Sequence, residues 1–351
     1  MNAVSAHATT DASPRPEPVR VELLPAGKTF PVAPGQSLLD AGLAAGLALP
    51  YQCRTGDCGT CRATVLGGEV ERQPAAWALD ETALATGHCL LCRTQARTAV
   101  RIECAEVDGL PGLPLRRLPV RVASIERPTA DVAVLHLQPP AGQTLDYRAG
   151  QYIDVVLRDG RRRSYSLATA PGKSDQLELH IRHRPGGAFT GQVFGGLKVR
   201  DMLRIEGPFG RFHLREETQA PMILLATGTG FAPIKAIIEQ ARRAGLRRSV
   251  TLYWGGRQRE DLYGDAMVRQ WARELPWLRY EPVLSRPQAG WGGRTGHVQQ
   301  AVLADYPDLS AHEVYACGSP AMVASAGSVL QAKAGLRPTN FHADAFAEAA
   351  A

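Results

Sequence analysis

Four cysteines constrain this chain more than any other feature. Three of them, Cys53, Cys58 and Cys61, stand in the pattern C-x4-C-x2-C, and Cys92 follows further along. This is the plant-type spacing for the four thiolates of a 2Fe-2S cluster. The glycines between them tolerate tight turns, which lets backbone N–H groups point at the cluster sulfurs. A structural zinc site is the alternative, but zinc sites rarely use this triplet, so the sequence predicts these four cysteines as metal ligands.

The length of 351 residues predicts two or three domains. The chain is 44% hydrophobic and 21% charged, as in globular proteins, and no apolar run is long enough to span a membrane. The cysteines outside the cluster set form no disulfide pattern, which indicates a reducing cytoplasm. Residues 1–18 lack the apolar core of a signal peptide, so we expect a disordered tail.

The net charge of +6 is unevenly distributed, because residues 1–107 hold 9 basic and 11 acidic side chains. The positive charge lies in later segments that are expected to hold pyrophosphates. Because no nucleic-acid-binding motif appears, we expect no nucleic-acid partner.

The first part of the chain has the pattern of a small β-grasp unit over residues 19–107. Residues 19–33 alternate and break at Pro25-Ala26-Gly27, which predicts a hairpin. A short helix follows Ser37, and one strand is expected over residues 61–70. Residues 108–117 lie in a stretch rich in proline and glycine and are the predicted linker.

After residue 117 the predicted secondary structure changes once, from short strands to strands that alternate with helices. Short strands separated by Gly and Pro predict an antiparallel β-barrel over residues 118–217. Five strands alternating with helices predict a doubly wound parallel sheet over residues 218–351. The fold class is therefore multidomain, α+β and α/β.

Two motifs in the barrel segment suit a phosphate-bearing cofactor. In Arg163-Ser164-Tyr165-Ser166, strand alternation puts Arg163 and Tyr165 on one face and Ser166 on the other; a basic edge strand is the alternative. The segment HIRHRPGGAFT offers backbone and hydroxyl donors to phosphate. Its candidate binding residues are His180, Arg182, Gly186, Gly187, Phe189 and Thr190.

Two further motifs follow strands of the parallel sheet. In G-x-G-x-A-P, glycines permit a tight turn and a helix N-terminus meets a nucleotide pyrophosphate; its candidate residues are Gly228, Thr229, Gly230, Ala232 and Pro233. The fourth strand ends at the carboxyl edge, where ligands bind, in Cys317, Gly318, Ser319 and Pro320. The alternative for Cys317 is a buried small apolar residue.

These motifs carry a family resemblance that covers nearly all of the chain beyond about residue 19. Residues 19–107, with LPYQCRTGDCGTCRATVLGGEV, resemble a plant-type ferredoxin domain. The remainder resembles the ferredoxin-NADP reductase superfamily, with a barrel for FAD and a parallel-sheet domain for NAD(P)H. The whole resembles the reductases of aromatic-ring oxygenases, of the phenol hydroxylase and naphthalene dioxygenase type. It resembles still more closely the CDP-6-deoxy-glucoseen reductase group.

The resemblance implies roles for individual residues. Arg163 pairs with the FAD pyrophosphate, Tyr165 lies against the flavin, and Ser166 hydrogen-bonds near its hydride-accepting atom. Cys317 lies beside the nicotinamide. Asp344 matches an acidic residue near the flavin, and Phe346 matches an aromatic that covers it. Ser166, Cys317, Asp344 and Phe346 are thus the catalytic candidates. Cys92 lies closer than Cys89 to the family's fourth ligand position.

The implied function is electron transfer from NADH through FAD to the 2Fe-2S cluster and on to a protein acceptor. That acceptor is a dideoxysugar dehydrase or an oxygenase component, and the reductase is expected to be a monomer. Ser285-Arg286 stands where NADPH-using relatives bind the extra phosphate, but His297 replaces their tyrosine, so NADH is preferred and NADPH stays open. The rival functions are direct reduction of a small substrate and a non-catalytic redox sensor.

Overall fold

The computed structural model describes residues 17–47, 49–51, 56, 59–72, 79, 81–104, 113–172 and 174–346. Helices and strands before the gap at 105–112 form one compact unit, and those after it form a second. Most of the predicted tail and the first half of the predicted linker, residues 108–112, lie outside the described residues. None of the helices that the structure describes has the length and apolarity needed to cross a membrane.

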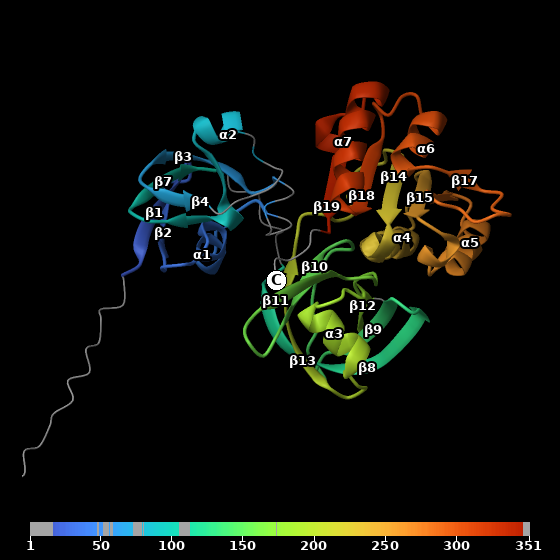
Figure 1. Cartoon of the computed structure of the whole chain (residues 1–351), viewed down its shortest axis with the longest axis horizontal. Coiled ribbons are helices and arrows are strands. Elements are labelled where there is room, and N and C mark those ends of the chain that lie inside the picture. The colour runs from blue at the N-terminus through green and yellow to red at the C-terminus, as the bar shows by residue number, and fades with distance from the viewer. Residues whose placement is uncertain are drawn as a thin grey trace, which may run out of the picture. The chain divides into compact units, whose positions relative to one another are not determined.

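The first unit is built on a mixed five-stranded sheet. The unit contains seven strands, five in this sheet and two in a separate pair: β1 (Val19–Leu24), β2 (Lys28–Val32), β3 (Arg62–Gly67), β4 (Val70–Arg72), β5 (His88–Leu90), β6 (Thr94–Ala96) and β7 (Val100–Glu103). The sheet order is β2-β1-β7-β3-β5, while β4 pairs with β6 apart from it. Figure 1 labels β1, β2, β3 and β7 of this sheet. Its short helices are α1 (Leu38–Ala44), α2 (Glu81–Ala85) and the 3-10 turn η1 (Leu91–Arg93).

The predicted hairpin and helix of this unit are confirmed, and the strand over 61–70 is corrected. β1 pairs antiparallel with β2, and the Ser37 hydroxyl caps α1 by accepting a hydrogen bond from the Asp40 N–H at 3.0 Å. The expected strand is two strands in different sheets. Gly68 separates them in a left-handed conformation (φ 88°), and a Cβ there would lie 2.2 Å from the Ala99 carbonyl oxygen.

The second unit begins with a six-stranded antiparallel barrel. Its strands are β8 (Arg116–Thr129), β9 (Val132–Gln138), β10 (Tyr152–Val156), β11 (Arg162–Ser166), β12 (Leu177–Arg182) and β13 (Met202–Phe209). Their order is β11-β10-β13-β8-β9-β12, and a bridge from Leu167 to Leu179 joins the two ends. Helix α3 (Ala188–Gly195) contributes Phe189 and Val193 to the barrel core.

A parallel sheet completes this unit, as predicted. Its strands are β14 (Met222–Thr227), β15 (Val250–Gly256), β16 (Leu278–Leu284), β17 (Arg294–Thr295), β18 (Glu313–Gly318) and β19 (Phe341–Ala345), in the order β17-β16-β15-β14-β18-β19. The two-residue β17 was not expected. The helices are α4 (Phe231–Arg243), α5 (Asp265–Glu274), α6 (Val298–Asp305) and α7 (Pro320–Ala334), and the 3-10 turns η2 (Gly228–Gly230), η3 (Arg259–Asp261) and η4 (Pro338–Asn340) join them.

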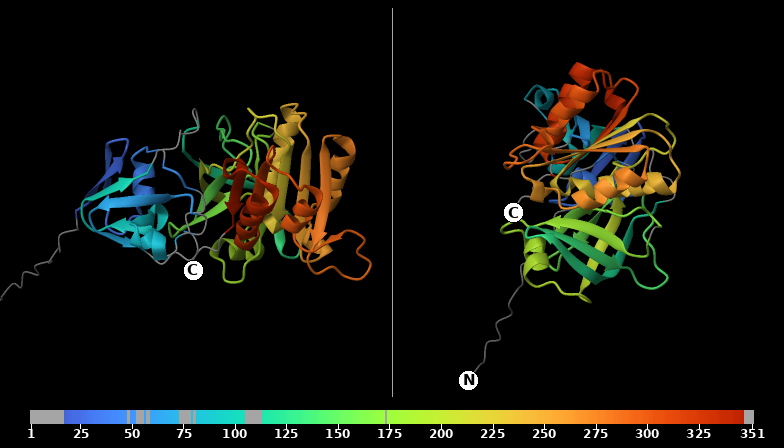
Figure 2. Two further views of the ribbon diagram at one scale, coloured as in Figure 1. Left: turned by 90° about the horizontal axis from the view of Figure 1, so that it is seen from above. Right: turned by 90° about the vertical axis from the view of Figure 1, so that its right-hand side faces the viewer.

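Alternation along the central strand explains the layering of this sheet. Leu224 and Ala226 of β14 pack with α4 and α5 in one apolar core. Ile223 and Leu225 point the other way, into a core with α6 and α7. The sheet therefore lies between two helical layers (Figure 2, right). The strand order reverses at β14, which pairs with both β15 and β18, and such a switch point opens a crevice for ligands.

Candidate functional site

A cavity of about 1330 Å³ lies between the barrel and the carboxyl edge of the parallel sheet. It is larger than a typical pocket for one small ligand. Most of the predicted cofactor residues meet on its wall. They are Arg163, Ser164, Tyr165, Ser166, His180, Arg182, Gly186, Gly187, Phe189, Thr190, Gly228, Thr229, Ala232, Gly318, Ser319, Pro320, Asp344 and Phe346. Gly230, Pro233 and Cys317 are not part of this lining.

Strand β11 and the start of α3 form the barrel side of the cavity. The Tyr165 ring lies 5.4 Å from the Phe189 ring, measured between centroids, and burial raises the pKa of Tyr165, so its phenol is neutral. The Thr190 hydroxyl donates to the Arg184 carbonyl at 3.0 Å. A Cβ on Gly187 would lie 2.4 Å from that hydroxyl. Glycine thus allows the turn to close onto the first turn of α3, whose N–H groups have no acceptor within the helix and form a candidate anion site.

Two interlocked turns form the sheet side. A Cβ on Gly230 would lie 2.3 Å from the Cys317 carbonyl oxygen, and one on Gly318 would lie 2.2 Å from the Thr227 hydroxyl. That hydroxyl accepts a hydrogen bond from the Ser319 N–H at 2.9 Å. Gly230 therefore serves close packing behind the cavity wall rather than direct contact with a ligand.

Cys317 lies in the core instead of on the wall. Its side chain is fully buried in the apolar cluster shared with α4. Burial, with Asp344 nearby, raises the pKa of its thiol well above the usual range, so the thiol is neutral. This geometry favours the alternative reading of Cys317 as a buried small apolar residue.

Ser166 and Asp344 bring the barrel and the last strand together. The Ser166 hydroxyl donates to an Asp344 carboxylate oxygen at 3.5 Å, and both side chains are buried. Phe346 follows β19 and lines the cavity, where its N–H donates to the Gly318 carbonyl at 2.7 Å. Three of the four predicted catalytic residues thus stand on one part of the wall.

His180 and Arg182 lie at the junction of barrel and sheet. His180 bonds Glu178 through Nε2 and the Tyr263 hydroxyl through Nδ1, each at 2.7 Å. Because both ring nitrogens are engaged, the geometry does not support His180 as a hydrogen-bonding ligand of a cofactor. Arg182 lies 3.5 Å from carboxylate oxygens of both Asp131 and Asp261, at the long limit of such contacts. The Arg182 guanidinium is therefore held more weakly by its protein partners than the His180 ring is.

In the first unit, the described part of the cysteine set is one close pair. The Sγ atoms of Cys61 and Cys92 lie 3.3 Å apart, while Cys53 and Cys58 fall outside the described residues. Cys89 is fully buried, and that burial raises the pKa of its thiol to about 11. Two sulfurs brought this close together suit a shared cluster, whereas the Cys89 thiol is held neutral in the core.

Several residues that line the cavity escaped sequence reasoning, including Asp131, Tyr152 and Asp261. Asp261 accepts hydrogen bonds from the N–H groups of Arg257 and Gln258 at 2.7 and 3.1 Å, and so shapes the turn after β15. These residues belong to no local motif, and only the packing of barrel on sheet brings them to the site.

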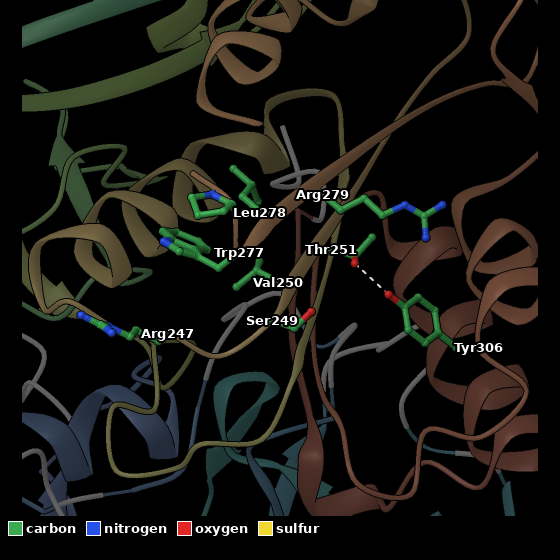
Figure 3. A pocket seen from close by; sticks show the side chains of 9 residues that line it. Arg247, Ser249, Val250, Thr251, Trp277, Leu278, Arg279 and Tyr306 are labelled. Atoms are coloured by element: carbon green, nitrogen blue, oxygen red, sulfur yellow. Dashed lines mark hydrogen bonds between the residues drawn. The ribbon is translucent and has the colours of Figure 1, made fainter. Parts of the chain in front are cut away.

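A second cavity, of about 600 Å³, lies at the amino ends of β15 and β16 (Figure 3). Thr251 bonds the Tyr306 hydroxyl there at 2.8 Å, and Arg279 pairs with Glu281 and Asp305. The polar groups of Thr251, Tyr306 and Arg279 thus have partners within the protein, whereas the larger cavity holds the convergent motifs.

Comparison with known proteins gives three family matches along the chain. A 2Fe-2S iron-sulfur cluster binding domain matches residues 21–97, an oxidoreductase FAD-binding domain matches 119–214, and an oxidoreductase NAD-binding domain matches 224–327. They confirm the predicted fold class and the predicted cofactors: a 2Fe-2S cluster, FAD, and NADH or NADPH.

Relatives match over almost the full chain. The CDP-6-deoxy-L-threo-D-glycero-4-hexulose-3-dehydrase reductase of Yersinia pseudotuberculosis is 38% identical over 93% of this chain and 98% of its own length. Reductase component 2 of the Comamonas terephthalate 1,2-dioxygenase is also 38% identical, over 91% and 94%. The crystal structure of the Amycolatopsis cytochrome P450 reductase GcoB superposes with a TM-score of 0.80 at 33% identity, covering 95% of this chain and 100% of that one.

Proposed function

Because the chain belongs to the ferredoxin-fused NAD(P)H:flavin oxidoreductases of the ferredoxin-NADP reductase superfamily, we propose that it passes electrons to the iron–sulfur dehydrase of a dideoxysugar pathway. The chain is an NAD(P)H-dependent reductase with FAD and a 2Fe-2S cluster. The observation that supports the first step, hydride transfer from the nucleotide to FAD, is one cavity in which the β11 motif, the G-T-G turn and the end of β18 meet.

FAD in this cavity would convert the electron pair of a hydride into single electrons for the cluster. In this proposal the Arg163 guanidinium and the N–H groups at the start of α3 hold its pyrophosphate. The Tyr165 ring packs against the flavin. Ser166 presents a hydroxyl to the reacting side of the ring, and Asp344, 3.5 Å away, orients that hydroxyl. Phe346 covers the site and excludes water.

The nucleotide is proposed to bind along the carboxyl edge, with its pyrophosphate on the turn of Gly228 and Thr229. Cys317 is proposed to support Gly318 from behind rather than to touch the nicotinamide. NADH is the proposed donor, since His297 stands where a tyrosine would bind the additional phosphate. Ser285 and Arg257 also line the cavity, and they are the groups through which NADPH would compete.

Cys53, Cys58, Cys61 and Cys92 are the proposed cluster ligands, supported by the close approach of Cys61 and Cys92. We retain the predicted boundaries: ferredoxin domain 19–107, linker 108–117, FAD barrel 118–217 and nucleotide domain 218–351. A monomer in the cytoplasm completes the proposal. Among the described residues, Cys61, Cys89, Cys92, Cys104 and Cys317 form no disulfide, which supports the choice of that compartment.

The proposed acceptor follows from the match to the Yersinia dehydrase reductase. A ring-oxygenase component is the second candidate, because the Comamonas reductase is equally similar. The test supplies the purified reductase with NADH or NADPH and offers each class of acceptor, a dehydrase and an oxygenase component, under identical conditions. Faster transfer to the dehydrase, with NADH as the better donor, is expected. Turnover with the oxygenase component alone would overturn the choice of acceptor.

A further inference from the structure

Five polar side chains beside the cavity form what we call the junction network: Glu178, His180, Lys235, Glu239 and Tyr263. Of these, His180 also lines the cavity. Glu178 and His180 belong to barrel strand β12, and Lys235 and Glu239 belong to α4. Tyr263 lies between η3 and α5. The first four are only 6 to 8% exposed. Burying an isolated charge costs folding free energy, so we expect the charged groups of this cluster to compensate one another.

Hydrogen bonds join the charged members across the junction. The Lys235 ammonium donates to Glu178 at 3.1 Å, to Glu239 at 3.0 Å and to the Ala168 carbonyl at 3.0 Å. Glu239 also accepts from the Ala170 N–H at 3.1 Å. All three donor positions of the ammonium are therefore used, and two of them bind groups of the barrel segment.

The bonds of His180 fix its tautomer. Burial opposes ionisation of Glu178, but the hydrogen bond from His180 and the charge of Lys235 outweigh it and lower the pKa of Glu178 to about 2. An ionised carboxylate only accepts hydrogen bonds, so His180 donates from Nε2. Its Nδ1 then accepts from the Tyr263 hydroxyl, whose pKa is raised well above its usual value by burial.

Tyr263 connects this histidine to the nucleotide-binding turn through aromatic packing. Its ring meets the rings of Phe231 and Trp254 edge to face, at 6.2 and 5.2 Å. Trp254 stacks on Phe231 at 4.0 Å, and its indole N–H donates to the Gly228 carbonyl at 3.3 Å. The contacts thus run from barrel strand β12 to both ends of the turn, to Gly228 at its start and to Phe231 directly after it.

We propose that His180, with Tyr263 as its partner, is a positioning residue that fixes the nucleotide-binding turn against the flavin-binding barrel. This inference rests on the proposed assignment of the two cofactors to the cavity. Lys235 bonds α4 to the same strand through Glu178. Strand β12 therefore contacts the turn through His180 and Tyr263, and the following helix through Glu178 and Lys235. Hydride transfer needs reacting atoms about 3–3.5 Å apart. If the nucleotide-binding turn could shift relative to the barrel, the rate of hydride transfer would fall before the affinity for the cofactors did.

The test compares two variants that each remove one hydroxyl from a partly covered tyrosine. Tyr263→Phe deletes the bond to His180. Tyr280→Phe, the matched control, deletes a 2.9 Å bond to Asp265 on the α5 side of the sheet. Both are purified as the full chain with FAD and the cluster. FAD content, the thermal midpoint and the rate of flavin bleaching at saturating NADH are measured, together with hydrogen exchange at the amides of residues 228–232.

For Tyr263→Phe we expect normal FAD content, faster exchange of the turn amides, and flavin bleaching slowed on the order of tenfold, since misplacement of reacting groups lowers the rate steeply. Tyr280→Phe is expected to change only the thermal midpoint. His180→Gln keeps an N–H donor and a carbonyl acceptor and should retain the rate, whereas His180→Leu should lose it.

Equal behaviour of the two tyrosine variants, in bleaching rate and in turn exchange, would overturn the positioning role. If instead the unaltered protein fails to bleach its flavin with NADH, the proposed function itself is wrong, so the two failures are distinguishable.

Discussion

Replacing Lys235 by methionine removes the positive charge that two buried carboxylates share. The carboxylates of Glu178 and Glu239, each less than a tenth exposed, would then be left without the cation that compensates their charges. Removing one partner of a buried ion pair costs about 3–5 kcal/mol, because the remaining charge is left uncompensated. For a unit of this size, each kcal/mol corresponds to roughly 2–4 °C in the thermal midpoint, so a fall on the order of 10 °C is expected.

The control comes from the same helix. Arg242 pairs with Glu274 at 3.7 Å, but both side chains are about half exposed, so Arg242→Met should cost less than about 1 kcal/mol. Both variants are unfolded by urea and by heat as the holoprotein. Adding Glu178→Gln and Glu239→Gln to Lys235→Met should recover most of the loss, because the stranded charges are then gone. A Lys235→Met protein as stable as Arg242→Met would refute the reasoning.

Three further predictions address other parts of the chain. Cys92→Ser should abolish the cluster's visible absorption and iron content while Cys89→Ser keeps them; the reverse pattern would show that Cys89 is the fourth ligand. Ionised Glu178 stabilises the folded state above its ordinary pKa of 4.5, and this contribution is lost as the pH falls toward about 2. Glu178→Gln should therefore flatten the acid limb of the stability curve by up to about 1.4 kcal/mol per pH unit, and an unchanged slope in urea melts would contradict the shift. Arg200 is exposed at φ 78°, so Arg200→Gly should raise the thermal midpoint slightly, since left-handed backbone costs a non-glycine residue about 1 kcal/mol; Arg204→Gly, within β13, should lower it.

Local signals predicted much of this fold because their causes are local. The Pro25-Ala26-Gly27 break and the Ser37 cap act within a few residues, and both elements form as expected. The strand–turn–helix reading of Gly228 to Pro233 also holds, since glycines and an N-terminal proline specify such a turn by themselves. The same reasoning missed the separation of β3 from β4, because the close approach of Ala99 to Gly68 comes from the folded sheet.

The sequence motifs predicted many of the residues that line the candidate site, but not the contacts that those residues make with distant parts of the chain. Lys235 and Glu239 have the i,i+4 spacing of an exposed helical ion pair, yet the barrel covers that face of α4 and buries both. His180 stands inside a motif that suits phosphate binding, but Tyr263, 83 positions away, occupies its Nδ1. The burial of the Cys317 thiol could not be predicted from its motif either, because it depends on the neighbouring turn at Gly230, which packs over the Cys317 carbonyl.

The most direct test of the electron path is an anaerobic rapid-mixing experiment on the holoprotein. NADH is added in less than one equivalent, and flavin absorbance and the electron paramagnetic resonance signal of the reduced cluster are followed together. The account predicts that the flavin bleaches first and that the cluster signal then rises as flavin colour partly returns. A flavin that bleaches while the cluster stays oxidised, or a cluster reduced before the flavin, would contradict it.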